Sequence, residues 1–200
     1  MSRPSSPFIP VTVSVALFAA MTLSGCAGTV IGAGATAGTA AMEERGIAGA
    51  ADDTGIRLRL NALYSGEDER LWRKIGFQVY GGRVLLTGAL DSPEMQAKAV
   101  QLAWRAEGVK EVINEIEVAA SGGLAGYGRD TWITAQLKSK LLFDKQISSI
   151  NYSIDTVRGK VFLIGLAQSR QELDRVINHA RSIDYVKKVV SYVKIKRPPA

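Results

Sequence analysis

The chain has one cysteine and one histidine among its 200 residues, Cys26 and His179. A disulfide within the chain needs a second cysteine, and a structural zinc site needs about four ligands, mostly Cys and His. Both are therefore excluded. Composition alone leaves a Cys–His nucleophilic pair conceivable. No paired carboxylates at a defined spacing and no Ser–His–Asp arrangement are found in the sequence. We therefore expect no catalytic residue, no metal site and no enzyme activity.

Cys26 follows directly on an apolar segment. Residues 8–23 are apolar apart from one proline and three hydroxyl residues, and Arg3 is the only charged residue before them. A membrane-spanning helix needs about 20 apolar residues, so this stretch is too short and too interrupted to be one. It is typical of the hydrophobic region of a secretory signal peptide. We predict that residues 1–25 are a signal peptide and take no part in the fold.

The end of this segment, Leu23-Ser24-Gly25-Cys26, resembles the bacterial lipobox. The resemblance implies that diacylglycerol is attached to Cys26, that the chain is cleaved before it, and that an N-acyl chain, palmitate, is added. Several acyl chains together anchor a protein stably, whereas a single chain does not. Ala27 follows instead of the Asp typical of inner-membrane retention, which favours the outer membrane. Acylation also consumes the Cys26 thiol, so the Cys–His pair is excluded. No other cofactor is expected.

Residues 26–51 are dominated by Gly, Ala and Thr and offer little to pack. Such a segment is typical of a flexible tether between an anchor and a domain. Its small-residue spacing would also suit a glycine zipper in a membrane. We favour the tether.

The rest of the chain contains an internal repeat. A shift of 77 residues aligns the chain with itself without a gap from about Asp53 to Val118. Gly82-Arg-Val-Leu-Leu-Thr-Gly88 meets Gly159-Lys-Val-Phe-Leu-Ile-Gly165. The matches fall on apolar, glycine and capping positions, which are the positions that a shared fold dictates. We predict two copies of one domain.

Each copy has the order αββαβ. A first helix, which we expect Asp53 or Asp130 to cap, is followed by a hairpin with strands at 76–80 and 84–88, or 152–156 and 161–165. A second helix follows, capped by Ser92 or Ser169. An alternating strand at 112–118, or 189–195, closes each copy. A helix between the second and third strands makes these two strands parallel. The expected class is α+β, with a three-stranded mixed sheet packed on two helices.

The αββαβ order and the G-[RK]-V-x-L-x-G strand before a Ser-capped helix resemble the BON domain. Two such domains behind a lipobox resemble the dual BON-domain lipoproteins of the outer membrane. The predicted boundaries are 52–119 for the first domain, 120–128 for a linker and 129–197 for the second domain. The resemblance implies a non-enzymatic protein, anchored in the outer membrane and facing the periplasm. It would bind anionic phospholipid through the first helix of its second domain and support envelope integrity.

The charge is divided unequally between the two copies. Residues 43–119 hold 10 basic and 13 acidic residues, and residues 129–197 hold 14 and 6, so the net charges are −3 and +8. A basic domain favours an anionic partner, a nucleic acid or an anionic membrane. An exported lipoprotein does not meet nucleic acid, so we expect an anionic phospholipid membrane.

The first helix of the second copy has two faces. With about 100° per residue, Ile133, Leu137 and Leu141 lie on one stripe, which we predict to be the core face. The counterpart of Trp132 in the first copy is Gly55, so the fold does not require an aromatic residue there. Trp132 either enters a membrane interface or packs on the first domain or the linker 121–128. We predict that phospholipid is bound by the outward stripe, its flanking lysines and the next residue: Trp132, Ala135, Lys138, Ser139, Lys140, Leu142 and Phe143.

Four further features are explained by the fold without a functional role. We predict Trp72 in a loop at 65–74, Trp104 in the core or at a domain interface, His179 half-buried on a helix, and the acids 67–69 in a solvated loop. An alternative function is an envelope adaptor, in which the acidic first domain contacts outer-membrane assembly, division-site or cell-wall proteins.

Overall fold

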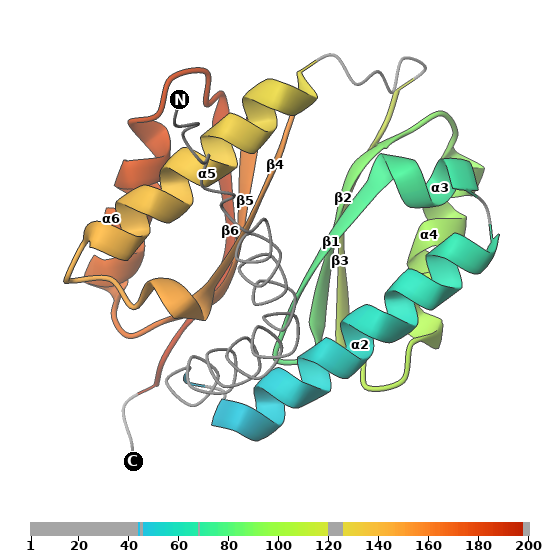
Figure 1. The fold of residues 1–200 in the computed structure, drawn as a ribbon, viewed down its shortest axis with the longest axis horizontal. Coiled ribbons are helices and arrows are strands. Elements are labelled where there is room, and N and C mark those ends of the chain that lie inside the picture. Colours follow the sequence, from blue (N-terminus) through green and yellow to red (C-terminus); the bar gives the residue numbers. More distant parts are fainter. Residues whose placement is uncertain (1–43, 45, 68, 120–125, 198–200) are drawn as a thin grey trace, which may run out of the picture. The chain divides into compact units, whose positions relative to one another are not determined.

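The computed structural model in Figure 1 describes residues 44, 46–67, 69–119 and 126–197. Residues 40–200 form one compact unit. The predicted signal peptide, Cys26, residues 26–43 of the tether and residues 120–125 of the linker lie outside the described residues.

The first domain is built from three helices and one sheet. Its sheet has the order β1-β2-β3, with β1 antiparallel and β3 parallel to the central strand. Its elements are α2 (Gly46–Glu67), α3 (Glu69–Lys74), β1 (Ile75–Tyr80), β2 (Arg83–Leu90), α4 (Pro93–Arg105) and β3 (Glu111–Val118).

The second domain repeats this arrangement, with a 3₁₀ turn, η3, in place of α3. Its elements are α5 (Tyr127–Phe143), η3 (Ser149–Asn151), β4 (Tyr152–Val157), β5 (Lys160–Ala167), α6 (Arg170–Arg181) and β6 (Lys188–Ile195). Every strand begins and ends 77 residues after its counterpart. Two α+β copies with mixed three-stranded sheets are therefore confirmed.

The second helices begin where the sequence predicts. The hydroxyl of Ser92 accepts the backbone N–H of Met95 at 3.3 Å, and that of Ser169 accepts the N–H of Glu172 at 3.1 Å. Pro93 occupies the first turn of α4, where its missing N–H costs nothing. Both N-cap predictions are confirmed.

The predicted caps of the first helices are wrong. α2 begins at Gly46 and α5 at Tyr127, so Asp53 and Asp130 lie inside their helices. The Asp53 carboxylate accepts the N–H groups of Gly81 and Gly82 at 2.7 and 2.8 Å. Each aspartate thus ties its helix to the hairpin turn. The start of α2 also places residues 46–51, which we assigned to the tether, in a helix.

Each domain has its own hydrophobic core between its helices and one face of its sheet. Ile56, Leu60 and Tyr64 of α2 are buried against the first sheet. Ile133, Leu137 and Leu141 of α5 are buried in the second, at 0, 0 and 1% exposure, which confirms the predicted core stripe.

A third cluster joins the opposite faces of the two sheets. It is formed by Tyr80 and Leu85 of the first domain with Phe162 and Ile164 of the second. Polar contacts surround it: the Arg83 guanidinium donates to the Tyr192 carbonyl at 2.8 Å, and the Thr87 hydroxyl donates to the Asp155 carboxylate.

Three of the minor predictions are wrong and one is confirmed. Trp72 lies in the short helix α3, and its exposed fraction is 46%. Trp104 is 53% exposed, because its neighbours Ala99, Leu102 and Ala103 are the residues of α4 that face the core. Glu67 is the last residue of α2 and Glu69 the first of α3, so neither lies in a loop. His179 is half-buried on α6, as predicted.

Candidate functional site

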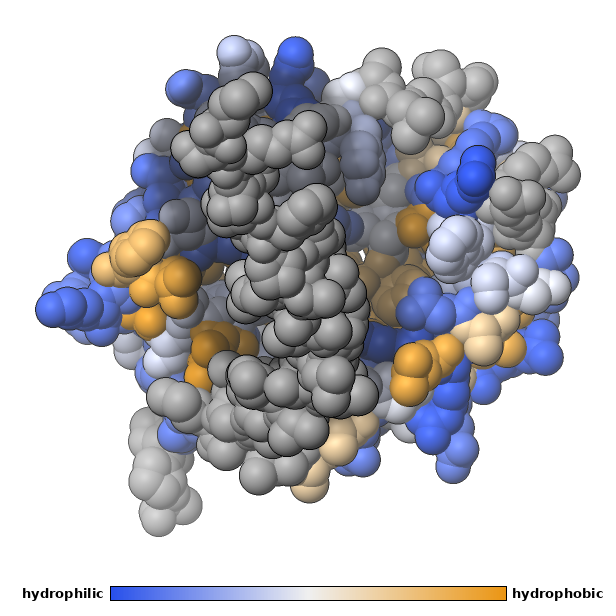
Figure 2. Space-filling view, viewed as in Figure 1, coloured by the Kyte–Doolittle hydropathy of each residue, from blue (hydrophilic) through white to orange (hydrophobic). Residues whose placement is uncertain are grey.

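The outward face of α5 is where the predicted site residues lie. Trp132 is 42% exposed, Leu142 67% and Phe143 80%. Ala135, Lys138 and Ser139 are also exposed, and Lys140 is half-buried. Six of the seven residues are therefore exposed on one helix and Lys140 is only partly so, whereas their role as a phospholipid site stays a prediction. Figure 2 shows hydrophobic patches separated by hydrophilic residues on the visible face, outside the grey atoms.

Trp132 has a partner within its own domain. Its ring packs edge-on against that of Tyr185, with the ring centroids 6.3 Å apart and an interplanar angle of 70°. The Arg129 guanidinium lies 4.8 Å from the centroid of the same Tyr185 ring. Trp132 is therefore supported by the loop between α6 and β6 while much of its indole faces solvent.

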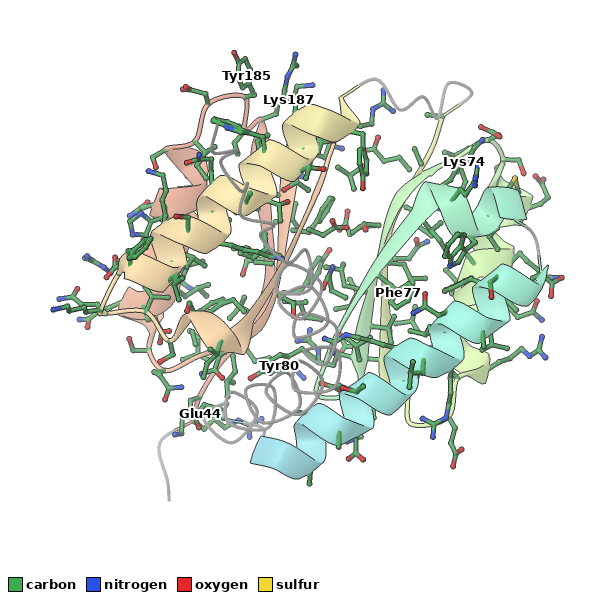
Figure 3. All side chains as sticks on the ribbon, in the orientation of Figure 1. Glu44, Lys74, Phe77, Tyr80, Tyr185 and Lys187 are labelled. Atoms are coloured by element: carbon green, nitrogen blue, oxygen red, sulfur yellow. The ribbon has the colours of Figure 1, made fainter. Side chains whose placement is uncertain are left out.

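A shallow pocket of about 340 Å³ adjoins this aromatic pair. Three segments form it: the first turn of α5, the β4–β5 turn and the α6–β6 loop. Figure 3 labels Tyr185 and Lys187 beside the N-terminal half of α5. The lining residues are Gly126, Arg129, Asp130, Arg158, Gly159, Tyr185, Val186 and Lys187.

Asp130 is the one carboxylate of this lining, and its two oxygens are engaged. They accept the backbone N–H groups of Arg158 and Gly159 at 2.7 and 2.8 Å. Gly159 cannot carry a side chain here, because a Cβ would lie 2.8 Å from the Tyr185 carbonyl. The turn, the loop and the helix are thus held together closely enough to shape the pocket.

A second polar cluster lies at the other end of α5. The Asp144 carboxylate contacts His179 Nε2 at 2.8 Å and Arg175 Nε at 3.0 Å. The His179 ring, the backbone N–H of Gln146 and the Arg175 guanidinium together lower the pKa of Asp144 to about 2. This network ties the end of α5 to α6, which accounts for His179 without a catalytic role.

Sequence reasoning missed four lining residues of the pocket: Arg129, Arg158, Tyr185 and Lys187. The repeat carries a signal for two of them. Arg158 and Tyr185 stand where the first copy has Gly81 and Gly108, so an Arg and a Tyr replace turn glycines.

No group of His, Cys, Asp and Glu that could hold a metal was found among the described residues. In the same part of the chain, no helix is long and apolar enough to cross a membrane.

The fold and the repeat define the chain as a tandem α+β protein with two copies of one αββαβ domain. Comparison with family models identifies both copies: the BON domain matches residues 52–120 and 129–197. The chain belongs to the BON-domain family.

Curated relatives extend the similarity over most of the chain. An uncharacterized protein in the gshII 5′ region of Anaplasma centrale is 42% identical over 72% of this chain and 95% of its own length. Outer membrane lipoprotein DolP of Haemophilus influenzae is 31% identical over 91% of this chain and 94% of its own. Osmotically-inducible protein Y of Escherichia coli is 31% identical over 72% and 73%.

Proposed function

We propose that the chain is a non-enzymatic lipoprotein of the cell envelope that binds anionic phospholipid through the outward face of α5. In this proposal acyl chains on Cys26 hold it in the outer membrane, facing the periplasm, where it supports membrane integrity. The lipobox resemblance and the similarity to DolP, whose name describes an outer membrane lipoprotein, support this location.

One observation carries the binding proposal: a half-exposed Trp and two exposed apolar side chains share a helix face with lysines. Trp132, Leu142 and Phe143 are 42, 67 and 80% exposed. Indole rings favour the headgroup boundary of a bilayer, and apolar side chains beside them gain by entering the acyl region. The domain has a net charge of +8, and each basic residue near an anionic surface adds about 1 kcal/mol.

The binding follows in two steps. The acyl chains first confine the protein to the membrane surface, which gives the second domain a high effective concentration of lipid. Trp132, Leu142 and Phe143 then enter the interface, while Lys138 and Lys140 pair with headgroup phosphates. A weak intrinsic affinity of α5 for lipid is therefore sufficient.

The test replaces Trp132 by Glu in residues 40–200, the compact unit that contains both hydrophobic cores. We expect Trp132→Glu to weaken binding to phosphatidylglycerol vesicles at least about tenfold, because a carboxylate at the interface repels the headgroups and an indole is lost. Binding is measured by co-sedimentation, and circular dichroism checks the fold. Binding of the unchanged chain to zwitterionic phosphatidylcholine vesicles, compared with phosphatidylglycerol, measures the contribution of the lipid's negative charge.

Trp104→Glu is the matched control. Trp104 is a comparably exposed tryptophan, 53%, on a helix of the acidic first domain. We expect this variant to bind phosphatidylglycerol as the unchanged chain does. If Trp132→Glu also binds unchanged, α5 is not the contact. If Trp104→Glu alone loses binding, the first domain rather than α5 contacts the lipid.

A further inference from the structure

The turn and loop beside α5 have backbone conformations that favour glycine, yet they carry large side chains. Arg158 has φ 54° and Tyr185 has φ 68°, and no other non-glycine residue among those described has a positive φ. Side chains are strained in this region of the map. Both residues line the pocket at the N-terminal end of α5.

The first domain shows what the fold itself requires at these positions. Gly81, with φ 63°, stands where Arg158 does, and Gly108, with φ 93°, stands where Tyr185 does. A similar pocket of about 380 Å³ lies beside them. Glycine therefore satisfies the turn and the loop, so folding does not explain the arginine and the tyrosine of the second domain. Strain of this kind is retained at functional sites when the side chains are needed.

The two pockets also differ in charge. The second-domain pocket has three cations, Arg129, Arg158 and Lys187, against one carboxylate, Asp130. The first-domain pocket has two cations against three carboxylates, and Asp52 occupies the position equivalent to Arg129. The exchange of sign at one place in a repeated fold points to an anionic ligand in the second copy alone.

The cations of the second pocket are available to such a ligand. No ion pair of Arg129 or Lys187 occurs within the described residues, although Arg129 rests on the Tyr185 ring at 4.8 Å. Arg158 has one partner, Glu117, at 3.3 Å, and 48% of its side chain is exposed. The lone pairs of Asp130 that would compete for these cations are directed at the backbone of the turn.

We propose that this pocket, formed by Arg129, Arg158, Tyr185 and Lys187, binds the phosphate of an anionic phospholipid headgroup. The inference rests on the proposed function, because the occupant of the pocket is a lipid already held at α5. The Tyr185 ring joins the pocket to the outward face of α5. The Arg129 guanidinium lies over the ring, and the centroid of the Trp132 ring lies 6.3 Å from its centroid. Trp132 would lie at the headgroup boundary while the phosphate occupies the pocket beside it. An arginine pair is suited to phosphate, since each guanidinium offers two parallel N–H donors.

The test gives the second domain the glycines that the first domain has at these two positions. The double variant Arg158→Gly with Tyr185→Gly, in residues 40–200, removes one cation and the ring beneath Arg129. We expect binding to phosphatidylglycerol vesicles to weaken at least about tenfold, since one cation alone accounts for about fivefold. Thermal unfolding is measured in parallel, and the midpoint should stay the same or rise because both strained conformations are relieved. A merely structural role would lower the midpoint.

Two controls isolate the pocket. Lys194→Gln removes the same charge near the far end of β6, where Lys194 lies 3.8 Å from Glu111, and should leave binding unchanged. Glu117→Gln frees Arg158 without altering the pocket and should not weaken binding. Binding of the double variant equal to that of Lys194→Gln would overturn the pocket assignment.

Two further comparisons separate the possible failures. If Trp132→Glu loses vesicle binding and the pocket variant does not, the proposed function stands and the pocket assignment fails. If neither loses binding, both fail. Inorganic phosphate, at matched ionic strength, should not displace the protein from vesicles. Displacement by phosphate would indicate a free-anion site and overturn the assignment to lipid.

Discussion

At the scale of single residues, the same aspartate makes the same contacts in both domains. Asp53 is 1% exposed, and its carboxylate accepts two backbone N–H groups of the β1–β2 turn. Asp130 does this for the β4–β5 turn. Because N–H groups at a turn have no strand partner, the aspartate supplies acceptors that the hairpin cannot provide for itself.

We predict that Asp53→Ala destabilises the protein by about 3 kcal/mol, because it leaves two N–H groups, one of them buried, without their charged acceptor. Asp53→Asn keeps one oxygen and should cost about half as much. Urea unfolding measures both. Asp52→Ala, at the exposed neighbouring position, is the control and should change stability little. An equal effect of the two alanine variants would contradict the assigned contact.

The sequence indicates that these residues matter but not what they contact. Asp-Thr ahead of an apolar period is typical of a helix N-cap, so the pattern predicts a local partner. The partner is instead a turn 28 and 29 residues further along the chain, which only the fold brings close. Likewise, the repeat aligns Arg158 with Gly81. Only the structure shows that Arg158 has a positive φ, a conformation in which glycine is favoured.

At the scale of elements, the strands and the starts of the second helices could be predicted to within one or two residues. Alternation, turn glycines and the Ser-Pro pair are local signals, and they coincide at these boundaries. The first helices begin well before the predicted caps, at Gly46 and Tyr127, and α5 has no side-chain cap. Small residues supply no boundary signal, so packing of the later turns decides where these helices start.

Gly88, within β2, is required because the backbone of Lys74 approaches it closely. A Cβ on Gly88, whose φ is 123°, would lie 2.2 Å from the Lys74 carbonyl oxygen. We predict that Gly88→Ala destabilises the first domain by at least about 3 kcal/mol through this contact and the strained φ. Gly128→Ala is the matched control, since Gly128 is helical and nothing lies within 4 Å. It should stabilise α5 by about 0.5 kcal/mol. Denaturant unfolding of both variants measures the difference, and a loss of similar size in both would contradict the close approach.

At the scale of the whole molecule, each central strand is covered on both faces. The apolar runs Val84–Leu86 and Val161–Ile164 are buried, one face against helices and the other in the shared cluster of Leu85 and Phe162. Continuous apolar runs are typical of strands buried on both sides. The sequence therefore indicates that a second face is covered but not that the other copy covers it, because residues that meet across this contact share no local pattern.

Asp155 is a half-buried carboxylate at this contact between the sheets. Asp155 of β4 accepts the Thr87 hydroxyl of β2 and the N–H of Thr156. Burial raises the pKa of Asp155 above its ordinary value of 3.8, against the lowering effect of the Thr87 hydrogen bond; the negative charge of Asp130 raises it further. The folded protein therefore holds this proton more tightly than the unfolded chain does. The contribution of Asp155 to stability therefore falls as pH rises from about 4 through the raised pKa.

We predict that Asp155→Asn, which cannot ionise, makes the protein more stable than the unchanged chain at neutral pH. Its amide keeps an acceptor for Thr156 and offers a donor to the Thr87 oxygen, so the contact between the sheets is retained. The gain should shrink as pH falls and vanish below about pH 4, where the unchanged chain is protonated in both states. Urea unfolding across this range measures it. Asp174→Asn, on the exposed side of α6 with 51% of its side chain accessible, should give no such trend. A destabilised Asp155→Asn at neutral pH would mean that the charged carboxylate, rather than its shape, holds the two sheets together.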